Sequence, residues 1–201
     1  MKTIAQIAAE LQGYDPQALP AAGVLDFLAR LVTPVRESQS LGLFEALGKV
    51  LAHDVISPLN VPPHDNSAMD GYAFDGMGLH KAQALSLKVM GTALAGKAWQ
   101  ACIQEGECVK IMTGAIMPQG LNTVVPQELC KQTSADAIEI PAGLLQMGDN
   151  RRLCGEDIMQ GKAALSQGAL ITPAAAGLLA SLGVPHVSVV RRLRVAYFST
   201  G

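Results

Sequence analysis

The stretch from Tyr72 to Asn150 constrains the fold most narrowly, because it consists of short runs typical of β-strands. The runs are LSLKVM, ECVKIM, NTVVPQEL and AIEIP, and glycine, proline and glutamine residues separate them. Val, Ile and Thr favour strands, whereas Gly and Pro interrupt them. The pattern therefore predicts a small all-β domain of the barrel or sandwich type, which we place at residues 61–150.

Helical patterns lie on both sides of this β domain. Apolar residues recur every three or four positions over residues 23–34 and again over residues 43–55, as in amphipathic helices. A buried helix is predicted over residues 172–182, because Thr-Pro suits its start and Gly-Val-Pro suits its end. Residues 1–60 and 151–190 are therefore predicted to form one discontinuous helical linker domain around the inserted β domain.

The last residues, 191–201, read RRLRVAYFSTG. LRVAYF is typical of a buried strand, and STG is a turn that commonly leads from a strand into a helix. A lone strand needs other elements to cover it. We therefore expect residues 191–201 to open a further α/β domain of a longer protein, and the fold class to be α+β with several domains.

Composition and charge exclude several classes of protein. Fifteen Lys and Arg against seventeen Asp and Glu give a formal net charge of −2, which argues against nucleic acid as a partner. The four cysteines form no Cys-x-x-Cys pair, and the first residues lack the long apolar run of a secretory signal. The predicted helix in the uncharged segment near the C-terminus spans about 15 Å, against about 30 Å for a bilayer core. We expect a cytoplasmic protein that does not enter a membrane.

Three familiar catalytic or metal-binding patterns are incomplete. The segment from Gly91 to Lys97 matches the start of a phosphate-binding loop, but Ala98 stands where a Ser or Thr would hold Mg²⁺. The cysteine and histidine spacings match no common zinc pattern. No G-x-S-x-G motif of a serine hydrolase is present. A plain β-turn and unligated thiols are the simpler interpretations.

Two loop segments combine hydroxyl, carboxylate and glycine residues. In the first, Ser67 and Asp70 stand three positions apart, and Gly71 permits a positive φ that would aim the carboxylate outward. In the second, Thr113 leaves a strand next to Gly114, so the turn can offer O–H and N–H donors to an anion. Each segment is equally compatible with an ordinary capped turn.

A third segment, NRRLCGED, combines guanidinium and carboxylate groups around a glycine. Arg152 can clamp an anion bidentately, while Glu156 and Asp157 can hold Mg²⁺ or orient a water molecule. A surface cluster of ion pairs is the alternative interpretation.

The order of these segments carries more information than any one of them. NSAMDGYA, IMTGAIMP and GEDI occur in this order and are followed by VAYFSTG. Together they closely resemble the molybdopterin molybdenumtransferase family, whose members include the E domain of gephyrin. The resemblance covers residues 25–201. It implies an enzyme of molybdenum cofactor biosynthesis that inserts molybdate into adenylated molybdopterin, releases AMP and uses Mg²⁺ or a similar divalent ion.

The resemblance also implies roles for particular residues. Asp70, Thr113 and Asp157 match catalytic positions of the family, and no metal ligands are assigned. The implied substrate-binding residues are Ser67, Gly114, Arg152 and Glu156. Donors such as Thr113 and Arg152 would face the anions, and the two aspartates would serve as metal ligands, water-orienting groups or anchors for basic side chains.

The family fold implies a homodimer with a small-molecule pterin substrate. Its subunit has a helical linker domain, a β domain, an α/β molybdopterin-binding domain and a C-terminal β-barrel. The cleft joins the α/β domain of one subunit to the β-domain side of the other. We therefore expect the 201-residue chain to be inactive alone. The alternative is a non-catalytic dimerisation or binding module on the same scaffold.

Overall fold

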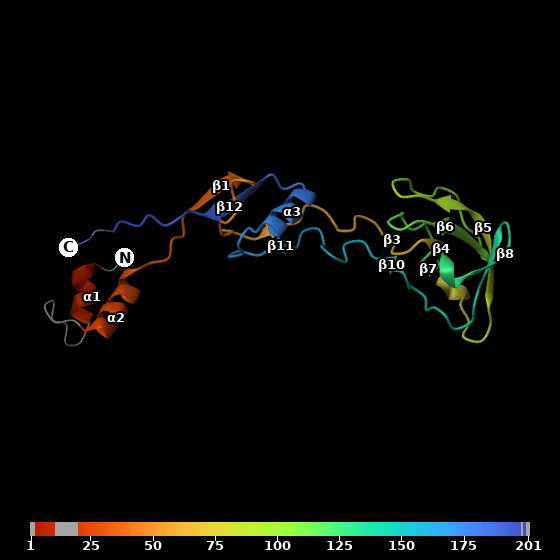
Figure 1. Cartoon of the computed structure of the whole chain (residues 1–201), viewed down its shortest axis with the longest axis horizontal. Coiled ribbons are helices and arrows are strands. Elements are labelled where there is room, and N and C mark those ends of the chain that lie inside the picture. The colour runs from red at the N-terminus through yellow and green to blue at the C-terminus, as the bar shows by residue number, and fades with distance from the viewer. Residues whose placement is uncertain (1–2, 11–19, 198, 200–201) are drawn as a thin grey trace. The chain divides into compact units, whose positions relative to one another are not determined.

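The computed structural model describes residues 3–10, 20–197 and 199 (Figure 1). The described chain divides into two compact units. The first unit comprises residues within 3–53, 167–177 and 184–199, and the second comprises residues 54–166 and 178–183. The second unit is continuous over more than a hundred residues and contains every predicted site residue.

The first unit combines helices with a two-stranded antiparallel sheet. Its elements are α1 (Ile4–Glu10), α2 (Ala21–Leu31), β1 (Ser38–Gly42) and β12 (His186–Val190). The strands pair from Ser38 with Val190 to Gly42 with His186. Alternate residues of β12, Val187 and Val189, are buried, as expected for a strand with one face in the core. The helix predicted over residues 23–34 is confirmed as α2.

The helix predicted over residues 43–55 is wrong. Residues 43–48 form turns, and Val50 and Leu51 form isolated bridges with Leu170 and Val189. The amide of Leu51 donates to Ala169 O at 2.9 Å rather than to a carbonyl four residues earlier. Leu43 and Leu51 are buried in the core while Leu47 is exposed, so the apolar spacing belongs to a folded turn rather than to a helix face. A purely helical linker domain is not confirmed.

Helix α3 (Pro173–Ser181) matches the helix predicted near the C-terminus. The hydroxyl of Thr172 accepts from the amide of Ala175 at 3.1 Å, which is an N-cap, and Gly183 adopts a φ of 72° after the last turn. By contrast, residues 191–197 form no strand, and Phe198 with residues 200–201 lies outside the described residues. A strand in this segment would need a neighbouring strand, and the described chain provides none.

The second unit is built on a six-stranded sheet with the order β7-β4-β6-β5-β9-β8. Neighbouring strands are antiparallel except β5 and β6, which are parallel. Each of the four strand-like runs in the sequence overlaps one of its strands, so the β-rich segment is confirmed. The six strands are β4 (Gly71–Phe74), β5 (Leu85–Ala93), β6 (Glu107–Ile111), β7 (Thr123–Pro126), β8 (Lys131–Ser134) and β9 (Ala137–Ile140).

Shorter elements complete the second unit. Two-residue or three-residue strands form two further ladders, β3 with β10 and β2 with β11. These elements are β2 (Val55–Ile56), β3 (Asn66–Ser67), β10 (Arg151–Arg152), β11 (Ala163–Leu165) and the 3-10 helices η1 (Gly76–Gly78) and η2 (Gln127–Leu129). The unit thus extends past the predicted limits of 61 and 150 on both sides.

Apolar side chains pack on both faces of the sheet. Ala73, Val109 and Ile111 belong to one buried cluster, whereas Phe74 and Cys108 belong to another. Adjacent residues of a strand point to opposite faces, so Val109 and Ile111 of β6 reach one cluster while Cys108 reaches the other. This double burial fixes β4 and β6, the strands whose ends carry the candidate site.

Two surface properties bear on the sequence expectations. No helix in the described part of the chain has the length and apolar character that a bilayer span requires.

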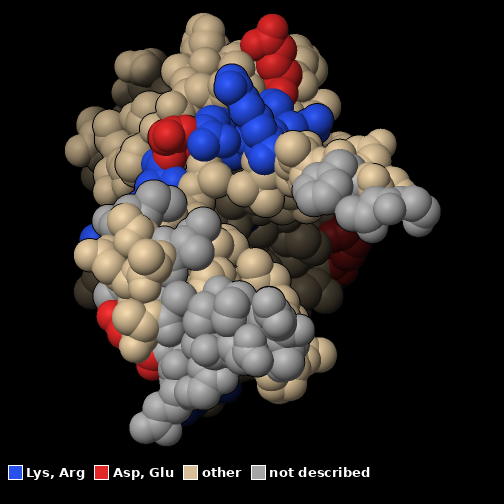
Figure 2. All heavy atoms as spheres, turned by 90° about the vertical axis from the view of Figure 1, so that its left-hand side faces the viewer, with Lys and Arg blue, Asp and Glu red and all other residues tan. Residues whose placement is uncertain are grey.

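Basic side chains gather on the face shown in Figure 2. In the first unit, Lys49, Arg191 and Arg192 line a pocket of about 260 Å³. A near-neutral chain therefore carries local basic surface.

Candidate functional site

Asp70 and Thr113 meet at one edge of the six-stranded sheet. Gly71 of β4 pairs with Ile111 of β6, which places Asp70 beside the chain that leaves β6. The amide N–H and the hydroxyl of Thr113 both donate to Asp70 Oδ1, each at 2.7 Å. Both residues are exposed. The antiparallel register therefore brings together two side chains that stand 43 positions apart in the sequence.

This contact favours the ionised form of Asp70. The amide and then the hydroxyl of Thr113 lower the pKa of the Asp70 carboxyl by hydrogen bonding to its charged form, and the charge of Lys110 lowers that pKa further. Asp70 Oδ2 accepts no hydrogen bond from the residues that the structure describes. Asp70 is thus an ionised carboxylate with one oxygen engaged and one available.

The two glycines of these loops differ from each other in conformation. Gly114 adopts a φ of 78°, in the left-handed region that favours glycine, as expected for the turn after β6. Gly71 does not have a positive φ, so the predicted reason for a glycine there is wrong. A Cβ at Gly71 would lie 2.0 Å from the carbonyl oxygen of Val125. Glycine is needed because β7 approaches the backbone closely.

Ser67 lies inside the fold rather than on the site surface. It is 1% exposed, and its hydroxyl donates to Met69 O at 2.5 Å. Its carbonyl accepts from the amide of Gly114 at 2.8 Å, and its amide donates to Ala115 O at 3.0 Å. Ser67 therefore positions the turn that carries Thr113, and its hydroxyl is not presented to a substrate.

Arg152, Glu156 and Asp157 form a second cluster. Arg152 Nε donates to Glu156 Oε1 at 2.6 Å, and its Nη2 donates to both oxygens of Asp157 at 2.7 Å. Glu156 Oε2 also accepts from the amide of Leu153 at 2.6 Å. These bonds lower the pKa of the Glu156 carboxyl and raise that of the Arg152 guanidinium. The carboxylates thus anchor Arg152, whose Nη1 donates to none of the described residues.

A residue that the sequence interpretation missed connects the three loops. Asp65 Oδ1 accepts from the amide of Cys154 at 2.8 Å, and its Oδ2 lies 3.7 Å from Arg151 Nε. Its carbonyl accepts from the amide of Met117 at 2.9 Å. Just after it, β3 pairs with β10, with Ser67 opposite Arg151. The position of Asp65 directly before NSAMDG was the only sequence signal of this role.

The described residues do not form a complete divalent metal site. Among them, no group of three or more His, Cys, Asp and Glu side chains could hold a metal ion. Asp70 Oδ1 is taken by Thr113, and both oxygens of Asp157 are taken by Arg152. For Asp157 this geometry favours the anchoring of Arg152, whereas Asp70 keeps one oxygen that can accept from a water molecule.

Within the described part of the chain, Arg152 Nη1 and Asp70 Oδ2 have no hydrogen-bond partner. Arg152 Nη1 can donate to an oxyanion, and Asp70 Oδ2 can accept from a water molecule or another donor. The Thr113 hydroxyl, expected to face an anion, donates to Asp70 instead. An oxyanion is the kind of ligand that suits the Arg152 guanidinium, and a water molecule is the kind that suits the Asp70 carboxylate.

Comparison with known proteins gives a consistent result. Residues 19–183 match the family described as MoeA N-terminal region (domain I and II). The chain is 41% identical over 165 residues to a molybdopterin molybdenumtransferase of Haemophilus influenzae, covering 82% of this chain and 40% of that protein. It is 33% identical over 189 residues to the molybdopterin molybdenumtransferase of a Nostoc species, covering 92% of this chain and 43% of that one.

A solved structure agrees with these sequence matches. The crystal structure of the molybdopterin biosynthesis moeA protein from Pyrococcus horikoshii OT3 superposes with a TM-score of 0.74 at 29% identity. The match covers 85% of this chain and 45% of that chain. The chain thus spans less than half the length of these relatives.

Proposed function

The chain belongs to the family of MoeA N-terminal regions, and on that premise we propose that it works as the N-terminal part of a molybdopterin molybdenumtransferase. The family acts in molybdenum cofactor biosynthesis. The proposed reaction inserts molybdate into adenylated molybdopterin and releases AMP. The 201-residue chain contributes one side of the site and is inactive alone.

The convergence of three loops on β3 and β10 is the observation that carries this proposal. NSAMDG supplies Asp70, the turn after β6 supplies Thr113, and the GED segment supplies Asp157 with Arg152. These charged groups are at least partly exposed, so a substrate can reach them. A purely structural role for these loops would not explain why a guanidinium nitrogen in one cluster and a carboxylate oxygen in the other both lack a partner among the described residues.

We assign a role to each group from its contacts. Arg152 Nη1 donates to molybdate or to the adenylate phosphate, and Asp157 and Glu156 hold the guanidinium in place. Asp70 orients a water molecule through Oδ2, and Thr113 holds the Asp70 carboxylate in its orientation. Gly114 allows that turn, and Ser67 supports it from inside the fold.

Mg²⁺ belongs to the proposed reaction but not to this chain alone. The described residues do not fit a complete Mg²⁺ site, because their two best carboxylates are engaged by donors. Octahedral Mg²⁺ commonly combines one or two carboxylates with water and substrate phosphates. The proposal therefore assigns no reaction step to a metal held by these residues.

The proposal also covers the oligomeric state and the ligands of the protein. We propose a cytoplasmic homodimer with a small pterin substrate, in which the pterin is bound by an α/β domain that is not part of these residues. A bound nucleic acid or membrane is not part of the proposal, in keeping with the net charge of −2.

The test is AMP release from adenylated molybdopterin in the presence of molybdate and Mg²⁺. It compares the 201-residue chain with a chimera in which the matched part of this chain replaces the corresponding 165-residue region of the Haemophilus influenzae relative. We expect no turnover by the chain alone and molybdate-dependent AMP release by the chimera, with the unmodified relative as positive control. A folded, dimeric chimera that releases no AMP would contradict the proposal and favour a non-catalytic module.

A further inference from the structure

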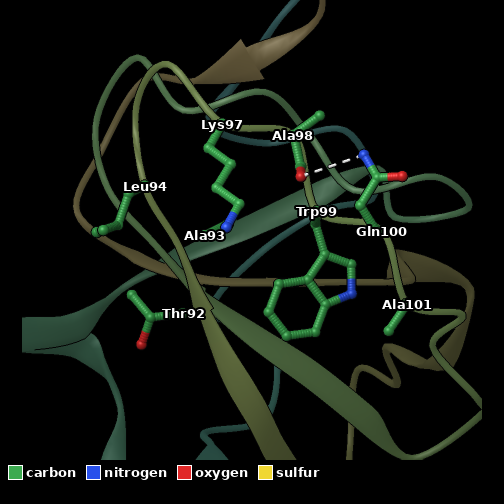
Figure 3. A pocket seen from close by; sticks show the side chains of 8 residues that line it. All are labelled: Thr92, Ala93, Leu94, Lys97, Ala98, Trp99, Gln100 and Ala101. Carbon is green, nitrogen blue, oxygen red and sulfur yellow. Dashed lines mark hydrogen bonds between the residues drawn. The ribbon is translucent and has the colours of Figure 1, made fainter.

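A pocket of about 390 Å³ lies beside the end of β5, outside the cluster of proposed catalytic residues (Figure 3). Its wall comes from the end of β5 and the turn and extended segment that follow it. The lining residues with functional groups or large side chains are Thr92, Leu94, Lys97, Trp99 and Gln100. This volume is in the range of small-molecule sites, about 300–1,000 Å³.

The pocket and the Asp70–Thr113 contact share one edge of the sheet. β5 and β6 are parallel, so their carboxyl ends lie at the same edge. Ala93, at the end of β5, accepts a hydrogen bond from the amide of Met112 at 3.2 Å, and Thr113 is the next residue. The pocket is therefore next to the candidate site within a single rigid sheet.

The aromatic wall of the pocket is fixed by packing. The Trp99 ring packs against the buried cluster that contains Ala93 and Val109. A Cβ at Gly91 would lie 2.7 Å from the ring, so the absence of a side chain there makes room for the indole. The indole nitrogen is buried and has no acceptor among the described residues. A large, rigid ring thus lines the pocket with its one donor unpaired.

Lys97 supplies the charge of the pocket. It is exposed, and no described carboxylate forms an ion pair with it. In Figure 3 its side chain extends from the turn toward the region of the Trp99 ring. An unpaired ammonium group close to an aromatic wall favours a ligand that is both planar and negatively charged.

The same lysine belonged to the incomplete phosphate-loop motif. In the structure no helix follows Lys97, and its amide donates to Leu94 O at 3.4 Å in a turn. The amides of this segment therefore do not form the phosphate cradle that opens a helix. An anion bound here would contact the Lys97 ammonium group and the Trp99 ring. This differs from a phosphate-binding loop, in which backbone amides hold the anion.

We propose that this pocket binds a small planar aromatic anion, with the anionic group at Lys97 and the ring against Trp99 and Leu94. The proposal does not depend on the transferase reaction. Its support is the pocket, the unpaired lysine and the fixed indole, all within the second unit.

Fluorescence of the 201-residue chain tests this directly, because Trp99 is its sole tryptophan. The probe is phenyl phosphate, compared with phenol, which lacks the anion, and inorganic phosphate, which lacks the ring. We expect a saturable change of Trp99 emission with phenyl phosphate, and binding at least roughly tenfold weaker for phenol and for inorganic phosphate. Free N-acetyl-tryptophanamide corrects for light absorption by the probe.

A matched pair of variants distinguishes binding in the pocket from nonspecific attraction of the anion to any surface lysine. Lys97→Met should weaken phenyl phosphate binding roughly tenfold, because a charge-assisted contact is lost. Lys88→Met removes an exposed lysine of β5 that lies outside the pocket lining, and it should leave the affinity unchanged. The proposal is overturned by no saturable change, by equal binding of phenol or inorganic phosphate, or by Lys97→Met binding as tightly as the unmodified chain.

Discussion

At Asp70 a single carboxylate oxygen accepts from both the amide and the hydroxyl of Thr113. The amide bond comes from the backbone, so no side-chain substitution at position 113 other than proline removes it. The hydroxyl bond can be removed by itself. This separation allows the two contributions to the lowered pKa of Asp70 to be measured independently.

Thr113→Val should raise the pKa of the Asp70 carboxyl part of the way toward its ordinary value, because only the amide bond would remain. Carboxyl ¹³C NMR titration measures this pKa, and Thr92→Val, at an exposed threonine of β5, is the control. An unchanged Asp70 pKa in Thr113→Val would show that the hydroxyl bond does not form.

The same contact has a defined pH dependence. Folding lowers the pKa of Asp70, so the stabilisation is fully present above the ordinary value of 3.8 and is lost as pH falls through the lowered value. The charge of this residue is therefore constant across the neutral range. A pH change within the neutral range therefore does not alter the site by changing the protonation of Asp70.

Residue types and spacing were enough to predict which loops carry the candidate site, but not how each residue acts. The sequence singled out Asp70 and Thr113 separately, and only the structure shows that Thr113 donates to Asp70. Ser67 looks equally polar in the sequence and is buried. The reason for Gly71 depends on the approach of β7, a strand more than 50 positions away, and no local pattern contains that information.

Helices were predictable where their ends carry a chemical signal. α3 begins with Thr172 and Pro173 and ends before Gly183, and each residue adopts the expected role. The segment at residues 43–55 has the right apolar spacing but also Gly48, with a φ of 71°, inside it. Its amides pair with residues 169–171, which are distant in sequence, so tertiary hydrogen bonds override the helical pattern.

Two glycines of the α3 region provide a matched prediction on unfolding free energy. Gly183→Ala should destabilise the protein by about 1 kcal/mol, because alanine is strained at a φ of 72°. Gly177→Ala, inside the helix with open space around it, should stabilise by roughly 0.5–1 kcal/mol. Urea unfolding measures both. Changes of the same sign in the two variants would contradict these backbone conformations.

On the scale of the whole molecule, the four cysteines differ in environment. Cys102 and Cys154 are exposed, whereas Cys108 is buried and Cys130 is half-buried. Burial raises the pKa of Cys108 to about 12 and that of Cys130 to about 11. Thiolate is the reactive form of cysteine, so the two pairs should react at different rates.

Titration with a disulfide reagent at about pH 8, near the ordinary thiol pKa, checks this difference. We expect rapid reaction of two thiols in the native protein and of all four after unfolding in guanidinium chloride. Cys108→Ser should leave the rapid native reaction unchanged, and Cys154→Ser should reduce it by half. Four equally fast thiols in the native protein would show that the sheet does not bury Cys108.

The division of the molecule was less predictable than its local structure. The sequence pattern indicated an inserted β-rich segment, but the compact unit also includes residues 54–60 and 151–166, which pair through β2 and β11. These strands have two or three residues, too few for periodicity to identify. The family resemblance rested on ordered motifs, and those motifs lie in the loops that converge.

The central claim is that Asp70 serves the reaction rather than the fold. AMP release by the chimera carrying Asp70→Asn, measured with its thermal midpoint, tests this most directly, with Asp136→Asn in an exposed turn as control. We predict a loss of turnover of roughly a hundredfold or more for Asp70→Asn, a thermal midpoint within about 2 °C of the parent, and full activity for Asp136→Asn. Retained turnover, or a large fall in thermal midpoint with Asp70→Asn alone, would contradict it.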